Sequence, residues 1–216
     1  MRIIFQYYFN EIKNLIDENG NFIGDVNAKK ASIQAVEALA QSLLGSTLCI
    51  RNHKYIIRML EIYYGGIGDD AHDWYRTNFI YKTSKYKEQT EVQNKKGFRI
   101  YLSSSNVDDT YTRFDIVVGH EGVPVSFLIR SVWDSDFNIV GAKNGSPNTV
   151  LKIMGLKAED HDKMVGEDDS ANEIVLQNTS AEIIEQRKLG VKKQRRYKVT
   201  SDFEEKNNLL WNFSLE

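Results

Sequence analysis

The sequence predicts an α+β (mixed α/β) fold in which one antiparallel sheet and flanking helices form a single domain. Apolar residues first recur at helical spacing, and short β-like runs separated by polar turns then follow. Because strands joined by short turns pair with antiparallel neighbours, these runs are expected to form hairpins. The length of 216 residues and the hydrophobic content of 41% suit one domain with a sizeable core.

The expected elements follow from these patterns and from the glycines, prolines and polar clusters that end each run. In chain order they are helices over 1–16 and 27–44, strands over 47–50, 55–63, 98–102, 112–118 and 123–132, a helix over 147–154, a strand over 173–176, a helical turn over 180–185 and a strand over 197–199. The charged segment 156–172 is expected to be a loop in which carboxylates such as Asp160 are solvated rather than metal-binding.

Glu61 stands out because it lies within the apolar strand 55–63, shortly before Gly65, Gly66 and Gly68. An unpaired carboxylate is costly to bury and tends to become protonated, so a Glu at the end of a strand and beside a glycine turn is a candidate functional acid or base. The alternative is that Glu61 faces solvent or pairs with a nearby arginine.

Arg130 lies in a second apolar run, directly after Leu128 and Ile129. Its guanidinium donors require a carboxylate, a phosphate or water at such a position. Glu61 is an available carboxylate, so the two residues are expected to pair.

The composition of the chain limits the kinds of molecule that the protein could bind. The net charge of -2 gives no overall attraction to nucleic acid, so a polyanion would have to bind a local patch. Two segments could supply it: 69–96, where aromatic residues alternate with Lys and Arg, and the basic cluster 188–196. An ordinary packed loop and a solvated face are the respective alternatives. The lone Cys49, the lack of a long apolar run and the lack of a leader predict an unexported protein without a membrane partner.

Six segments in one order carry a family resemblance: 38–50, 61–72, 101–103, 125–131, 144–156 and 183–191. Within the second, an aromatic Tyr63, the acidic Asp69 and Asp70, and His72 follow Glu61 at characteristic spacings. Together these segments resemble the alkyladenine (3-methyladenine or N-methylpurine) DNA glycosylases over about residues 35–199.

The resemblance implies a curved antiparallel sheet with helices and a monofunctional DNA glycosylase. Such an enzyme hydrolyses the N-glycosidic bond of an alkylated or deaminated purine that is flipped out of double-stranded DNA. Glu61 would be the general base for the attacking water and Arg130 would orient it. The base pocket would contain Tyr63, His72, Tyr101 and Asp115. The implied DNA contacts are Ser104, Arg76, Asn78, Lys192, Lys193 and Arg195.

The same resemblance implies that no metal or organic cofactor is required, because alkylated purines are cationic and leave easily. The enzyme is expected to be a monomer in the cytoplasm, associated with the nucleoid if the source is prokaryotic. The resemblance divides the chain into an N-terminal helical extension (1–30), a glycosylase-like domain (31–200) and a C-terminal tail (201–216).

Three positions depart from the family pattern. Ser104, in a polar loop, takes the place of the tyrosine that the family inserts into DNA, and Asp115 takes the place of an asparagine on the pocket wall. A Thr-x-Arg-Asn element is reduced to Arg76-Thr77-Asn78. These departures motivate one alternative, a catalytically altered or inactive descendant that binds nucleic acid or a protein. The His-Asp pairs of the sequence motivate a second, a metal-dependent phosphohydrolase built on His72-Asp73 with Asp69, Asp70 and His161-Asp162.

Overall fold

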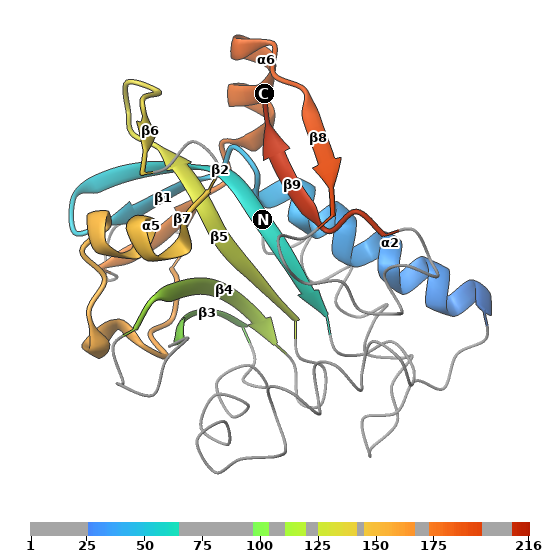
Figure 1. Ribbon diagram of the computed structural model, residues 1–216, viewed down its shortest axis with the longest axis horizontal. Coiled ribbons are helices and arrows are strands. Elements are labelled where there is room, and N and C mark those ends of the chain that lie inside the picture. Colours follow the sequence, from blue (N-terminus) through green and yellow to red (C-terminus); the bar gives the residue numbers. More distant parts are fainter. Residues whose placement is uncertain are drawn as a thin grey trace.

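A computed structural model of the chain describes residues 26–64, 97–103, 111–119, 125–141, 145–166, 173–195 and 209–216. In this part of the chain a curled antiparallel sheet carries three α-helices (Figure 1). The main path of the sheet runs through β3 (Gly97–Ser103), β4 (Arg113–Gly119), β5 (Val125–Trp133), β2 (His53–Tyr64), β1 (Thr47–Ile50) and β7 (Ile174–Gln177). The remaining elements are β6 (Ile139–Val140) beside β5, β9 (Asn212–Leu215) beside β2, β8 (Val191–Gln194) beside β9, the helices α2 (Val26–Leu43), α5 (Pro147–Ile153) and α6 (Ser180–Arg187), and the 3₁₀ turn η3 (Ala158–Asp160). The predicted α+β architecture is confirmed at this level.

The hairpin that carries Glu61 is confirmed, with a tighter turn than expected. Arg51 and Asn52 both have positive φ, 45° and 74°, as in the two-residue turns that suit the twist of a hairpin. His53 and Lys54 therefore already belong to β2, where they pair with Ile50 and Cys49. The extra pairing lengthens β2, the strand on which the candidate site is built.

The central strands present two different faces. Every second residue of these strands, such as Ile62 and Phe127, lies on one face and belongs to the main hydrophobic core. Helix α2 packs on this face and contributes Val36, Leu39 and Leu43 to the same core. The opposite face carries polar residues that are nevertheless buried, among them Glu61 and Arg130. This alternation follows from the period of two along a strand, and it gathers the buried polar groups on one side of the sheet.

The prediction that Asp160 is solvated is wrong. Asp160 is 0% exposed, its Oδ1 pairs with Arg51 and with Lys163 Nζ, and its Oδ2 accepts the backbone N–H of Lys157. Burial raises the pKa of this carboxyl, but the hydrogen bonds from Arg51, Lys157 and Lys163 outweigh burial and hold the pKa below its usual value. Asp160 therefore ties the β1–β2 turn to η3.

The C-terminal residues form a strand that the sequence prediction did not include. β9 pairs with β2 over Met59, Leu60 and Glu61, so the end of the chain lies directly beside the candidate catalytic carboxylate. β8, which the basic cluster contributes, pairs along the other edge of β9. The predicted helix over 1–16 and the predicted strand over 197–199 lie outside the described residues, and the division into extension, domain and tail stays a prediction.

Candidate active site

Glu61 is buried on the polar face of β2, with 1% of its surface exposed. Its Oε1 accepts hydrogen bonds from Arg130 Nη1 at 3.1 Å and from Asn212 Nδ2 at 3.4 Å, and its Oε2 accepts the Tyr63 hydroxyl at 3.3 Å. The expected pairing of Glu61 with Arg130 is therefore present. In such a low-dielectric setting, electrostatic interactions between this ion pair and the groups beside it are stronger than they would be in water.

The register of β2 against β5 explains how Arg130 reaches this position. Two irregularities interrupt the pairing between Ile57 and Leu60, so that Arg58 on β2 and Arg130 on β5 each lack a directly opposite residue. Such bulges bend a strand locally and re-aim a side chain. Here the bulge places the Arg130 guanidinium between the Glu61 carboxylate and the carbonyl of Gly145, which accepts from Nη2 at 3.0 Å.

Position 145 requires glycine, both because of its backbone conformation and because neighbouring side chains leave no room for a Cβ. Its φ is +79°, in the left-handed region, and an added Cβ would lie 2.7 Å from Met59 Sδ and 3.1 Å from Arg130 Cβ. The predicted turn before α5 thus has a second role, because it brings a backbone carbonyl against the arginine that holds Glu61. The sequence predicted the turn but not this contact.

A continuous row of cross-strand partners passes through Glu61. Tyr101 on β3 pairs with Asp115 on β4, Asp115 with Leu128 on β5, Leu128 with Glu61, and Glu61 with Asn212 on β9. Directly paired residues project from the same face of a sheet. The sequence-predicted Tyr101 and Asp115 therefore share the face of Glu61, and they lie on the opposite side of it from Asn212.

Asp115 is a buried acid within this row. Its Oδ2 accepts the Ser126 hydroxyl at 3.0 Å, and its Oδ1 is buried with no hydrogen-bond partner in the described structure. Burial, as the largest cause, raises the pKa of Asp115 to about 7; the Ser126 hydrogen bond and Arg113 oppose this rise, and the charge of Glu61 adds to it. The acid is therefore poised between its neutral and charged forms near neutral pH.

Two curated proteins share sequence similarity with the chain. Both are from Ehrlichia ruminantium, strains Welgevonden and Gardel, and both are named "Putative 3-methyladenine DNA glycosylase". Each is 30% identical over 123 residues, which are 56% of this chain and 58% of the relative. The match thus spans little more than half the length of either relative. No family model matches the chain.

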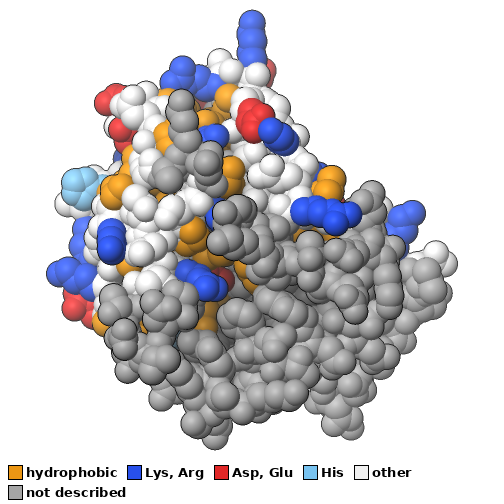
Figure 2. All heavy atoms as spheres, in the orientation of Figure 1, with side chains coloured by type: hydrophobic (Ala, Val, Ile, Leu, Met, Phe, Trp, Pro, Cys, Tyr) orange, Lys and Arg blue, Asp and Glu red, His pale blue; other side chains and the backbone are white. Residues whose placement is uncertain are grey.

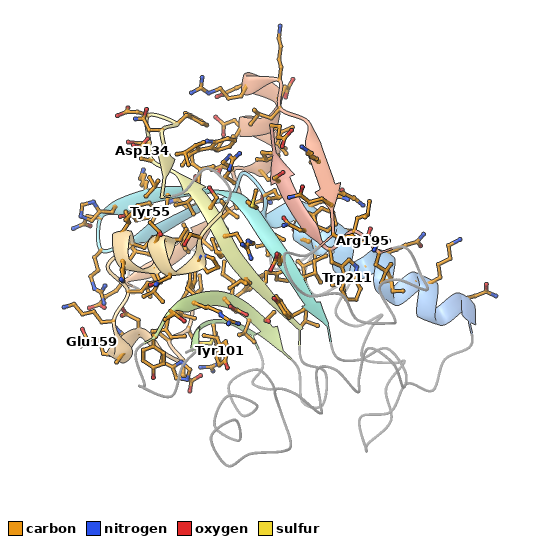
Figure 3. The ribbon with its side chains drawn as sticks, viewed as in Figure 1. Tyr55, Tyr101, Asp134, Glu159, Arg195 and Trp211 are labelled. Atoms are coloured by element: carbon orange, nitrogen blue, oxygen red, sulfur yellow. The ribbon has the colours of Figure 1, made fainter. Side chains whose placement is uncertain are left out.

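The predicted contacts to DNA divide into two groups. Ser104, Arg76, Asn78 and the pocket residue His72 lie outside the described residues. Lys192, Lys193 and Arg195 come from β8 and the residue after it. β8 pairs with β9, which lies on the opposite side of β2 from β5, β4 and β3, and Figure 3 shows the labelled Arg195 and Tyr101 well apart. The structure therefore gathers Glu61, Arg130, Tyr63, Tyr101 and Asp115 on one face and leaves the basic residues apart from them.

The lysines of β8 already have carboxylate partners. Lys192 Nζ lies 3.1 Å from Glu216, and Lys193 Nζ lies 2.9 Å from Glu37 and over the Phe213 ring. On the face shown in Figure 2, the Lys and Arg side chains of the described residues are scattered among other side chains. A phosphate bound at β8 would have to compete with these internal ion pairs.

His161 and Asp162, the two members of the candidate metal set that lie within the described residues, have other roles in the structure. His161 Nδ1 accepts the backbone N–H of Leu102, and its ring lies 5.8 Å from the Tyr111 ring. Asp162 forms an ion pair with Arg99 at 3.1 Å. Among the described residues, no three His, Cys, Asp or Glu side chains are close enough to hold a metal together, and no helix there is long and apolar enough to span a membrane.

Asn212 is a site residue that the sequence prediction missed. The available signal was the alternation of Trp211, Phe213 and Leu215 with Asn212 and Ser214, which is the period of a half-buried strand. The sequence alone gave no reason to place that strand beside Glu61.

Proposed function

We propose that this protein is a monofunctional DNA glycosylase that hydrolyses the N-glycosidic bond of alkylated or deaminated purines. The observation that carries the proposal is the buried Glu61 carboxylate, held by Arg130 and Tyr63 on a face that also bears Tyr101 and Asp115. The names of the two Ehrlichia relatives support the same class of enzyme. The monomeric state and the cytoplasmic location stay predictions.

In this proposal the damaged nucleotide leaves the duplex and its base stacks against flat side chains. Tyr63, Tyr101 and His72 supply aromatic rings, and stacking of a base on such a ring is worth about 1–3 kcal/mol. As the bond between C1′ and the base breaks, its electron pair goes to the base, so a cationic alkylated purine departs neutral. The oxygen of water bonds to C1′, and the proton that water loses passes to Glu61.

Arg130 has a positioning role in this reaction. Its guanidinium holds Glu61 Oε1 while the Gly145 carbonyl holds the guanidinium, so the carboxylate is fixed by two successive hydrogen bonds. A carboxylate that is fixed in this way meets the water in one orientation. It does not have to be reoriented when it accepts the proton, so that cost is absent from the reaction barrier.

Asp115 is the residue that we propose to face the edge of the base. As a neutral acid it can donate a hydrogen bond to a purine acceptor, and as a carboxylate it can accept one from an amino group or stabilise a cationic base. With its pKa at about 7, the choice of lesion is expected to change with pH.

The experiment that tests the proposal is incubation of the protein with duplexes that carry methylated purines or hypoxanthine, followed by scoring of alkali-labile abasic sites. Glu61→Gln keeps the shape of the side chain and removes the base, so excision should fall by about 10²–10⁴-fold while DNA binding is retained. Glu37→Gln is a matched control, because it makes the same chemical change on α2 in an ion pair with Lys193.

Excision by Glu61→Gln at the wild-type rate would contradict the assignment of Glu61. If the wild-type protein binds the duplexes but releases no base from any of them, the catalytically inactive descendant becomes the better account.

A further inference from the structure

Asn212 places an amide directly beside the candidate general base. It is the cross-strand partner of Glu61 on β9, it is 3% exposed, and its Nδ2 lies 3.4 Å from Glu61 Oε1. Oε1 is thus shared between Arg130 and Asn212. The donor side of the amide faces the carboxylate, because the carbonyl side would be repelled by it.

The other polar atom of this amide is not used by the described protein. Asn212 Oδ1 is buried and has no hydrogen-bond partner among the residues that the structure describes. An unsatisfied buried acceptor costs about 1–3 kcal/mol, a penalty that an apolar side chain of the same size would avoid. Its neighbours Trp211 and Phe213 are apolar and buried, so packing gives no reason for an amide here.

The position of Oδ1 suits a water that also contacts Glu61. Oδ1 and Nδ2 are bonded to the same carbon, and Nδ2 is already in contact with Oε1. One water can therefore bridge Oδ1 and the carboxylate, as ordered waters do between buried polar groups. Such a water would donate one proton to each acceptor and direct a lone pair away from both.

The row of cross-strand partners places this water on the opposite side of Glu61 from the residues proposed to contact the damaged purine. Tyr101 and Asp115, two of the proposed contacts of the damaged purine, lie on the β4 side of Glu61, whereas Asn212 lies on the β9 side. Direct displacement at a sugar carbon requires the attacking water and the leaving group on opposite faces of the ring. Asn212 is therefore on the side of Glu61 from which the water has to attack.

We infer that Asn212 is a positioning residue whose Nδ2 fixes the Glu61 carboxylate and whose Oδ1 holds the attacking water. The inference rests on the proposed function and adds a residue to its water-binding side. When the water attacks C1′, the water proton that is hydrogen-bonded to Glu61 passes to the carboxylate, and the hydrogen bond from the other water proton to Oδ1 keeps the oxygen aligned. The amide itself neither gains nor loses a proton.

The kinetic test uses Asn212→Leu, which keeps the branched heavy-atom skeleton of the side chain and removes both polar atoms. We expect the single-turnover excision rate to fall by about 100-fold, as for a misplaced reactant, with unchanged affinity for lesion DNA. The melting temperature should stay within about 3 °C of wild type or rise, because a buried unsatisfied group is removed. Asn212→Ser, whose hydroxyl can donate and accept, should recover part of the rate.

Ser214→Ala is the matched control, since Ser214 is buried on the same strand two residues further, opposite Met59 rather than Glu61. Its excision rate should remain within about threefold of wild type. An excision rate of Asn212→Leu within threefold of wild type, or a rate loss that parallels a large fall in melting temperature and is not recovered by Asn212→Ser, would overturn the inference.

A crystal structure of the wild-type protein at a resolution that shows ordered water tests the inference without any activity. We expect one water within hydrogen-bonding distance of both Asn212 Oδ1 and the Glu61 carboxylate. Clear density with a protein atom at that place, or with no water there, would overturn the inference. If the wild-type protein excises no base, the proposed function fails separately, and the density still decides whether Asn212 holds a water.

Discussion

Removing the arginine that holds Glu61 is expected to destabilise the fold as well as the site. In Arg130→Met the side chain keeps most of its apolar length, but the Glu61 carboxylate, 1% exposed, loses its cation. The Gly145 carbonyl loses its donor at the same time. The perturbation therefore leaves one buried charge and one polar group poorly satisfied.

The expected cost follows from this burial. Breaking a buried ion pair by removing one partner typically costs about 3–5 kcal/mol. For a chain of this length, 1 kcal/mol corresponds to roughly 2–4 °C in melting temperature. Arg130→Met should therefore melt about 6–20 °C below wild type at neutral pH.

The assay is thermal unfolding of Arg130→Met, Glu61→Gln and the double variant, followed by circular dichroism. The double variant should be more stable than the sum of the two single losses predicts, because it has no unpaired carboxylate. Lys192→Met is the control: its ion pair with Glu216 is 54% and 52% exposed, and such pairs contribute about 1 kcal/mol or less. A melting temperature of Arg130→Met within 2 °C of wild type, or strict additivity in the double variant, would refute the reasoning.

Two further predictions concern the neighbours of this pair. Gly145→Ala puts a Cβ 2.7 Å from Met59 Sδ at a φ of +79°. We expect the free energy of unfolding, measured in urea, to fall by about 1–3 kcal/mol, and excision to become about tenfold slower because Arg130 shifts. An unchanged excision rate would contradict the role of this contact. Asp115→Asn tests the raised pKa of about 7: the folded state binds the proton more tightly than the unfolded state, so the contribution of Asp115 to stability is present below about pH 4 and is lost as pH rises through 7. The stability of the variant relative to wild type should therefore rise by about 3 kcal/mol between pH 4.5 and pH 8. A stability difference that is equal at the two pH values would refute the raised pKa.

The sequence predicted the parts of the site whose signals are local. Glu61 and Arg130 were found because a charged residue inside an apolar strand run is conspicuous, and the need of each for a partner pointed to the other. The flanking hairpin was found because its apolar runs are separated by a polar turn. These features depend on a few neighbouring residues, which a single sequence displays.

The missed features depend on contacts between distant segments. Asp160 is buried because Arg51, 109 residues away, pairs with it, whereas a charged segment read alone indicates a solvated loop. Asn212 is 151 residues from Glu61 and meets it only because β9 pairs with β2. The bulge at Arg130 is likewise a property of the register between β2 and β5, which no local pattern encodes.

The central claim, that Glu61 activates water to release a damaged purine, is tested most directly by detection of the free base. Wild type and Glu61→Gln are mixed in excess with a duplex that carries a single alkylated purine, and the released base is quantified by mass spectrometry over time. The account predicts free base from wild type and a release by the variant that is at least about 100-fold slower at equal DNA occupancy. Release at equal rates by the two proteins would contradict it.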